Sequence, residues 1–121
     1  MKIHNHEMHH VPKIWGWERW ITNNEKYCGK VLHFDEGHFC SFHYHKIKAE
    51  HFYVSMGTIE ITYGYHEDIA QAEKATLNVG DAFHVQVGLI HQMRAVGGDA
   101  EMFEFSTTHF DEDSYRISPG Q

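Results

Sequence analysis

The sequence predicts an all-β domain, built as an antiparallel sandwich or barrel. Its apolar residues recur at a period of two rather than 3.6, and the alternating runs are short and rich in β-branched and aromatic side chains. Glycine-containing turns close these runs at intervals typical of sandwiches and barrels. A chain of 121 residues with 41% hydrophobic residues can bury one core, so we expect a single domain over residues 1–121.

Eight segments show this alternation, and together they define an expected barrel core over about residues 28–107. Turn signals separate them, among them DEG at 35–37, VGD at 79–81 and GGD at 97–99. One segment, 66–75, has the composition of a helical turn and is interpreted mainly as a loop. In chain order, the expected strands are residues 28–34, 38–45, 50–56, 58–64, 75–79, 81–87, 91–96 and 100–107.

The segments before this core differ in character. Residues 1–12 are polar and histidine-rich, and we expect a flexible, solvated tail. Residues 14–22, IWGWERWIT, are too aromatic to remain in water, so we expect a strand paired against the barrel or across a subunit boundary. A barrel of this size has little interior left for Trp15, Trp17 and Trp20, and exposed aromatic clusters commonly mark interfaces. We therefore expect a homodimer.

The segment after the core, STTHFDEDSYRI at 106–117, allows two interpretations. Its acidic residues favour a solvated run that leaves the domain. Its aromatic and aliphatic residues instead favour a short helix or arm folded back beside the barrel mouth. In that second case His109 or Arg116 would contact an anionic substituent of a substrate, for which arginine offers a bidentate fork.

Charge and composition exclude several classes of partner. The net charge of −7 disfavours a nucleic acid or an anionic membrane surface, which would need clustered lysine and arginine. No apolar run approaches the roughly 18–20 residues of a membrane span. The N-terminus lacks the apolar core of a signal peptide, so we expect a cytoplasmic protein. In that reducing compartment Cys28 and Cys40 are expected as semi-buried thiols.

One stretch between two glycines, GHFCSFHYHKIKAEHFYVSMG, concentrates metal-binding side chains. His43 and His45 lie two apart on an expected strand, so both imidazoles point to one face. A polar hairpin then brings Glu50 back on the adjacent strand, as a third donor. His91, which follows the turn at Gly88, is the best candidate for a fourth ligand. Neutral imidazoles and a carboxylate suit one divalent transition metal such as Mn, Fe, Co, Ni or Zn.

The spacing of this stretch resembles the first motif of the cupin superfamily. Gly37, five residues, His43, one, His45, four, Glu50, six and Gly57 reproduce that motif. The resemblance implies a double-stranded β-helix, a jelly-roll-like antiparallel barrel, with N- and C-terminal extensions. It also implies a metal held by three histidines and a glutamate.

The second cupin motif follows in Gly80, five residues, Gln86, one, Gly88, two and His91. Two positions depart from the family, which usually has proline at Gln86 and asparagine at Ala95. Neither is a metal ligand, so these departures concern the shape of the loop. Gln86 is a candidate substrate-binding residue. The remaining histidines are interpreted as solvated or strand-surface residues: His4, His6, His9, His10, His33, His38, His51, His66 and His84.

The period of two also predicts the lining of the site. If Glu50 faces inward, Phe52 does too, and His91 brings Met93 inward. In the last strand either Met102, Glu104 and Ser106 or Glu101, Phe103 and Phe105 face in, and the alternation favours the aromatic set as core packing. Many cupins place a polar residue of this strand in the pocket, which makes Glu104 a candidate. Lys30 is either a surface lysine or a cation for an anionic substrate.

The flanking segments resemble small cupins related to the barrel domain of mannose-6-phosphate isomerases. That resemblance implies a small-molecule carbohydrate partner, a sugar or sugar-phosphate, and an isomerase- or epimerase-like reaction in polysaccharide or sugar-nucleotide metabolism. Glu104 is then the candidate base, and Glu50 the weaker one because metal ligation lowers its basicity. Two alternatives remain open: an Fe(II) dioxygenase with the same ligands, and a non-catalytic carbohydrate-binding or sensing cupin.

Overall fold

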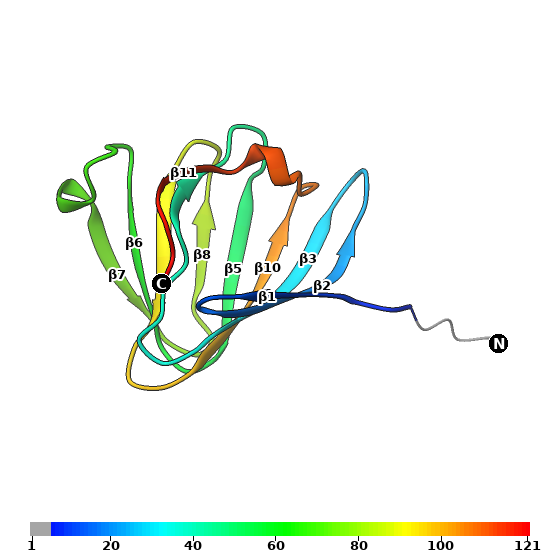
Figure 1. Cartoon of the computed structure of the whole chain (residues 1–121), viewed down its shortest axis with the longest axis horizontal. Helices are drawn as coiled ribbons and strands as arrows, with labels where there is room; N and C mark the ends of the chain where they lie inside the picture. The colour runs from blue at the N-terminus through cyan, green and yellow to red at the C-terminus, as the bar shows by residue number, and fades with distance from the viewer. Residues whose placement is uncertain (1–5) are drawn as a thin grey trace.

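The computed structural model describes residues 6–121 and consists of two antiparallel sheets that face each other (Figure 1). The six-stranded sheet has the order β1-β2-β3-β10-β5-β8, and the five-stranded sheet has the order β11-β4-β9-β6-β7. The strands are β1 His9–Lys13, β2 Gly16–Asn23, β3 Cys28–Phe34, β4 Phe42–Tyr44, β5 Glu50–Met56, β6 Ile59–Gly64, β7 Glu73–Leu77, β8 Ala82–Val85, β9 Ile90–Ala95, β10 Ala100–Ser106 and β11 Tyr115–Ser118.

The core fills the space between the two sheets, and it follows from the period of two. In β5 the inward residues Glu50, Phe52 and Val54 are buried, while the outward His51 and Tyr53 are exposed. The same alternation appears in β3, where every second residue is buried. The fold class and the inward direction of Phe52 were therefore predicted correctly.

Some strand boundaries differ from the prediction. The expected strand 38–45 is regular only over Phe42–Tyr44, with an isolated bridge between Phe39 and Arg94. The first half of this segment makes only isolated backbone hydrogen bonds, such as Cys40 N–H to the Met93 carbonyl at 3.1 Å, and therefore forms no regular strand. Residues 66–75 contain a short 3₁₀ turn, Ile69–Gln71, before β7 begins.

The N-terminal segment extends the six-stranded sheet. Strand β2 pairs with β3. Of the two predicted arrangements for residues 14–22, pairing against the barrel is therefore the one observed, and not pairing across a subunit boundary. Strand β1 pairs in turn with β2, so residues 9–12 differ from the expected flexible tail. The part of that tail formed by residues 1–5, including His4, lies outside the described residues. Pairing is favoured here because it satisfies backbone groups that an isolated edge would leave to water.

The tryptophans of this segment are covered within the chain. Trp15 is buried and stacks on Phe34, with 4.5 Å between ring centroids. Trp17 stacks on His33 at 5.1 Å, and Trp20 is half-buried. Because these contacts lie within one chain, the three rings do not require a partner subunit. The homodimer stays a prediction.

The C-terminal segment folds back, as the second of the two interpretations expected. It forms a 3₁₀ turn, Asp111–Asp113 (η2), and strand β11, which pairs with β4 (Figure 1). The folded-back segment therefore adds a strand to the sheet that carries two of the candidate metal ligands. The solvated interpretation is wrong for these residues.

The last barrel strand presents Met102 and Glu104 to the interior, and the preference for the aromatic set was wrong. Phe105 is 57% exposed on the outer face. The register decides this direction, because Glu104 lies opposite both Lys30 of β3 and Phe52 of β5, whose side chains are buried. Side chains directly opposite each other in a sheet share a face.

Candidate metal centre

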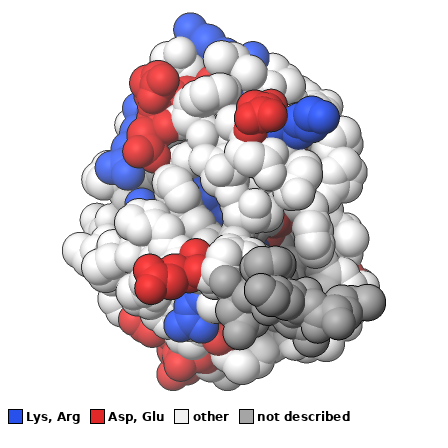
Figure 2. Space-filling model, turned by 90° about the vertical axis from the view of Figure 1, so that its right-hand side faces the viewer, with Lys and Arg blue, Asp and Glu red and all other residues white. Residues whose placement is uncertain are grey.

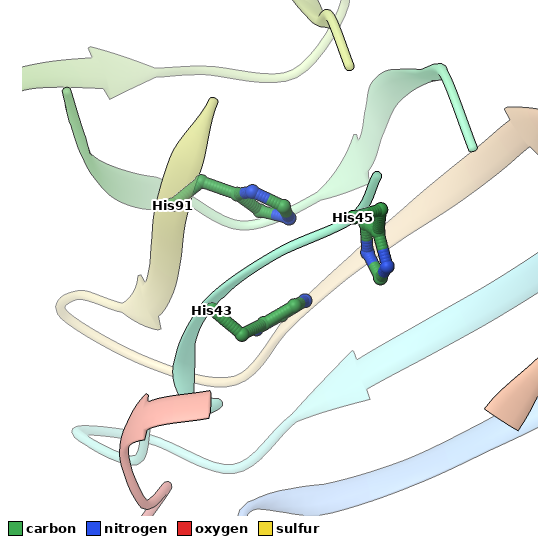
Figure 3. A group of neighbouring side chains, drawn as sticks. All are labelled: His43, His45 and His91. Carbon is green, nitrogen blue, oxygen red and sulfur yellow. The ribbon is translucent and has the colours of Figure 1, made fainter. Parts of the chain in front are cut away.

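Three imidazoles meet inside the barrel (Figure 3). His43 lies in β4, His45 follows that strand, and His91 lies in β9, where it is paired directly with His43. Ligand atoms of the three rings lie within 4.8 Å of one another. Glu50 reaches the same point from β5 in the opposite sheet, since its Oε1 lies 3.0 Å from His45 Nε2 and 3.4 Å from His91 Nε2. The structure thus brings all four predicted ligands together.

Each ring is oriented through its second nitrogen. The Nδ1 atom of His43 lies 2.9 Å from the Ser41 carbonyl, and that of His91 lies 3.0 Å from the Leu89 carbonyl. A carbonyl can only accept a hydrogen bond, so both Nδ1 atoms carry the proton and donate it. The Nε2 atoms are then unprotonated and free to bind a metal, as in metal sites whose histidines are fixed by a second partner.

The atoms at the meeting point lack hydrogen-bond partners. His45 Nε2, His91 Nε2 and Glu50 Oε1 are buried, and none makes a hydrogen bond with acceptable geometry, although the glutamate is close. Buried polar atoms without partners are rare, because each loses its hydration without compensation. A divalent transition metal would coordinate all three, so the residues present fit such an ion.

Burial also sets the charges of the ligands. The pKa of His43 lies well below its usual value because burial, then the His91 and His45 rings, disfavour its charged form. Burial alone would raise the pKa of Glu50, but the two imidazoles and Lys48 outweigh it and hold the pKa well below its usual value. A neutral imidazole and an ionised carboxylate are the forms that ligate metals.

A buried lysine lies beside the ligands. Lys48 Nζ lies 3.4 Å from Glu50 Oε2, 3.1 Å from Glu104 Oε2 and 2.9 Å from His109 Nδ1. Burial lowers its pKa, but the two carboxylates outweigh burial and raise it above its usual value, so Lys48 is protonated. An ammonium can only donate, so His109 Nδ1 accepts. Burial first, then Lys48, lowers the pKa of His109 to about 4, which keeps this ring neutral.

Glu104 lies in this group with a different balance of charges. Burial and then Glu50 raise the pKa of Glu104, and Lys48 and Lys30 only partly oppose that shift. Its Oε2 accepts hydrogen bonds from Lys48 and from the Ser106 hydroxyl, the latter at 3.0 Å. Two carboxylates in one site whose pKa values are pushed apart are typical of acid–base pairs.

A pocket of about 420 Å³ contains these side chains. Lys30 is 2% exposed, which excludes its surface interpretation; its Nζ lies 3.5 Å from Glu18 Oε1 and 4.2 Å from the centroid of the Trp20 ring. The predicted residues that line the pocket are Lys30, His43, His45, Glu50, Phe52, His91, Met93, Glu104, His109 and Arg116.

One predicted substrate-binding residue lies elsewhere. Gln86 is exposed, does not line the pocket, and its side-chain amide donates to the Tyr65 hydroxyl. The structure therefore places Gln86 outside this pocket, in contrast to the prediction. The neighbouring Val85 is the inward residue of β8 and is 1% exposed, so the alternation turns the next side chain out.

Sequence reasoning missed Lys48, Glu18 and Asp113, all of which contact residues of the site or its walls. Lys48 lies in a turn, where the period of two gives no direction, and a lysine in such a place is usually solvated.

A second histidine group, His33 with Asp35 and Asp99, lies far less buried. His33 is stacked on Trp17 and lies within hydrogen-bond distance of Glu101, at a half-buried position of β3.

The stacked His51 and His84 are exposed on the outer face, as expected. Among residues 6–121 no helix has the length and apolar character to cross a membrane. The face shown in Figure 2 carries acidic and basic side chains in small mixed groups, with no broad patch of one sign.

Comparison with known proteins identifies the fold. No family model matches the sequence, and no curated protein matches it. Among solved structures, the capsular polysaccharide assembling protein CapF from Staphylococcus aureus is similar with a TM-score of 0.81 and 17% identity, over 94% of this chain and 35% of CapF. Oxalate decarboxylase from Lactobacillus farciminis is similar with a TM-score of 0.77 and 20% identity, over 90% of this chain and 33% of the decarboxylase.

KdgF from Halomonas sp. is similar over nearly its whole length, with a TM-score of 0.72 and 20% identity, over 88% of this chain and 90% of KdgF. The chain thus spans about a third of CapF and of the decarboxylase but most of KdgF. All three have the cupin fold, in agreement with the two sequence motifs. This chain is a small β-rich protein with the cupin fold.

Proposed function

We propose that the protein is a metal-dependent cupin that acts on a sugar or sugar-phosphate in an isomerase- or epimerase-like reaction. The observation that carries this proposal is the convergence of three imidazoles and Glu50 on one point, with His45 Nε2, His91 Nε2 and Glu50 Oε1 left without hydrogen-bond partners. A divalent metal held there by His43, His45, Glu50 and His91 would polarise a carbonyl or neighbouring hydroxyls as a Lewis acid.

Carbohydrate as the substrate class is supported by the neighbours and by the pocket. CapF is a capsular polysaccharide assembling protein, which suits a role in polysaccharide metabolism. Charged and polar groups line the pocket together with the aromatic rings of Trp15, Trp20 and Phe52. Such a combination suits a polyhydroxylated ligand, whose hydroxyls need donors and acceptors while its carbon–hydrogen faces contact a ring.

Glu104 is the proposed base. Both hydrogen bonds that the described residues give it fall on Oε2, which leaves Oε1 to take a proton from the carbon next to a carbonyl. The proton is then returned to the neighbouring carbon, so that the sugar is isomerised without a net change in protons. The raised pKa of Glu104 suits this exchange, because a base that operates near neutral pH must also hold the proton it takes.

Deuterium incorporation tests this function. The metal-loaded protein is incubated in D₂O with aldoses, ketoses and their phosphates, and carbon-bound deuterium is measured. We expect incorporation with one of them and a loss of about 100-fold or more in Glu104→Gln, with metal content unchanged. Equal incorporation by the variant would contradict the role of Glu104. Iron in the purified protein together with oxygen consumption would instead identify the dioxygenase alternative.

One observation favours a second candidate, a non-catalytic carbohydrate-binding protein. Glu104 is held by both Lys48 and Ser106, an arrangement that also suits a purely structural carboxylate. Sugar binding by the wild type without deuterium incorporation from any tested sugar would support this candidate.

We also propose a homodimer located in the cytoplasm. The outer face of the six-stranded sheet exposes Phe105 at 57% and Tyr53 at 42%, on the neighbouring strands β10 and β5. Exposed aromatic side chains of this kind are typical of interfaces. The two cysteines, Cys28 and Cys40, are buried free thiols, which suits a reducing compartment. Sedimentation of a monomer at micromolar concentration would contradict the dimer.

A further inference from the structure

The three histidines of the metal centre are not oriented in the same way. His43 and His91 each donate Nδ1–H to the carbonyl two residues earlier, so each ring is fixed by its own strand region. His45 Nδ1 instead lies 2.7 Å from the carbonyl of Asp113, a residue 68 positions later in the C-terminal segment. The orientation of one candidate ligand thus depends on a part of the chain beyond the barrel.

The side chain of the same residue holds a turn beside the site. Asp113 is 2% exposed, and its carboxylate accepts hydrogen bonds from the backbone N–H groups of Lys46, Ile47 and Lys48, at 2.9, 3.2 and 3.0 Å. Bonds from three backbone donors to an ionised carboxylate are strong and directional. They offset the cost of burying the charge, which has no lysine or arginine partner among the described residues.

This turn joins the two halves of the metal centre. It connects β4 in one sheet to β5 in the other, and therefore lies between His45 and Glu50 in the chain. It also carries Lys48, whose ammonium contacts Glu50 and Glu104. A shift of the turn would move a ligand from each sheet and the lysine together.

The C-terminal segment is itself fastened at both ends. Before Asp113, the Asn23 side chain donates to the His109 carbonyl at 3.0 Å and accepts from the His109 N–H at 2.9 Å. After it, β11 pairs with β4. Asp113 is therefore held from both sides, by Asn23 at the end of β2 and by β11, which pairs with the strand that carries His43.

We propose that Asp113 is a positioning residue of the metal centre: its carbonyl fixes the ring of His45, and its carboxylate fixes the turn that sets His45, Lys48 and Glu50 relative to one another. The inference rests on the metal-binding part of the proposed function. It makes residues 107–118 part of the metal centre and not only a wall of the substrate pocket. Loss of partners that orient a ligand commonly weakens metal binding by about 10- to 100-fold.

The test uses the full-length, metal-free protein titrated with Co²⁺, whose visible absorption reports the number and geometry of its ligands. Asp113→Asn has nearly the same shape, but its amide offers one acceptor oxygen in place of two. We expect its dissociation constant for Co²⁺ to rise about 10- to 100-fold with an altered spectrum, and Asp113→Glu to recover part of the affinity. Glu112→Gln, an exposed neighbour in the same 3₁₀ turn, is the matched control.

Co²⁺ affinity of Asp113→Asn within about twofold of the wild type would overturn the inference, as would an equal loss in Glu112→Gln. A wild type that binds no Co²⁺ would overturn the metal-dependent function as well, so the two failures are distinguishable. Should Asp113→Asn not fold, nitrogen NMR of the wild-type imidazoles carries the test. We expect His45 in the Nδ1–H form with a slowly exchanging proton, and an Nε2–H form would refute the contact to Asp113.

Discussion

Replacement of Lys48 by methionine tests the charge balance of the site most directly. Lys48 is 2% exposed, and its ammonium lies 3.1 Å from Glu104 Oε2 and 3.4 Å from Glu50 Oε2. Methionine has a similar length and no charge, so the change removes the ammonium with little change in packing. The two carboxylates then remain buried without their shared counter-ion.

The size of the effect follows from these distances. At an effective dielectric constant of about 20, each contact is worth about 5 kcal/mol of Coulomb energy. The substitution also removes the desolvation cost of the buried ammonium, which is several kcal/mol and offsets part of this loss. Removing one partner of a buried pair therefore typically lowers the free energy of unfolding by roughly 3–5 kcal/mol. For 121 residues the entropy of unfolding is about 0.25 kcal/mol per kelvin, so a loss of 3 kcal/mol lowers the melting temperature by about 12 °C.

Urea denaturation of the metal-free protein at pH 7 measures this loss. The matched control is Lys26→Met, an exposed lysine that we expect to change stability by about 0.5 kcal/mol or less. Glu104→Gln in the Lys48→Met background should restore about 1–3 kcal/mol of the free energy of unfolding, because it removes the charge of one of the two carboxylates left without a counter-ion. A loss below about 1 kcal/mol in Lys48→Met, or no restoration by Glu104→Gln, would refute a charge balance in which Lys48 neutralises both glutamates.

Three further outcomes are expected. His43→Ala should remove most bound metal whereas His51→Ala should not, because His51 lies on the outer face; equal metal content by elemental analysis would contradict the assignment. The pKa of His43 is well below its usual value because of burial, so below about pH 6.5 the unfolded chain binds a proton that the folded protein does not. The free energy of unfolding of the metal-free protein should therefore fall by about 1.4 kcal/mol per pH unit below about pH 6.5 because of His43. In His43→Ala the slope of this free energy against pH should be smaller by about one proton, and identical slopes in the two proteins would contradict this. Gly57 and Gly97 both have φ near +75°, but a Cβ at Gly57 would lie 2.3 Å from the Asp99 carbonyl oxygen, while nothing lies within 4 Å at Gly97. The free energy of unfolding should fall by about 1–2 kcal/mol in Gly97→Ala and by about 2 kcal/mol more in Gly57→Ala. Equal decreases in the two variants, measured by thermal denaturation, would show that the close contact at Gly57 has no effect.

The fold and the four candidate ligands could be predicted because they depend on local rules. The period of two places His43 and His45 on one face. The turn after β4 crosses to β5 in the opposite sheet, so the expected hairpin onto the adjacent strand was wrong, although Glu50 still faces the two imidazoles. Glycines at the turns fix the ends of the strands. His43, His45 and Glu50 lie close together in the sequence, whereas His91 was found through the spacing of the second cupin motif.

The surroundings of the ligands depend on register and on contacts distant in the chain. The alternation in β10 allows either face to be inward, and only its pairing with β3 and β5 turns Glu104 inward and Phe105 outward. Gln86 follows the inward Val85 and therefore faces out. The family spacing that suggested a role for Gln86 carries no information on that direction.

What the sequence by itself determined is the β class, most of the strands and the ligand set, since the first two follow from spacing within single strands and the ligands from the spacing of the two cupin motifs. Only the tertiary structure decided that Lys48 lies between two buried glutamates and that Asp113 holds His45 from the far end of the chain. A turn residue has no periodic direction, and an acidic run near a terminus has the composition of a solvated segment. Both become part of the site only because the barrel supplies buried partners for their charges, and those partners lie more than fifty residues away in the sequence for both Lys48 to Glu104 and Asp113 to the turn at 46–48.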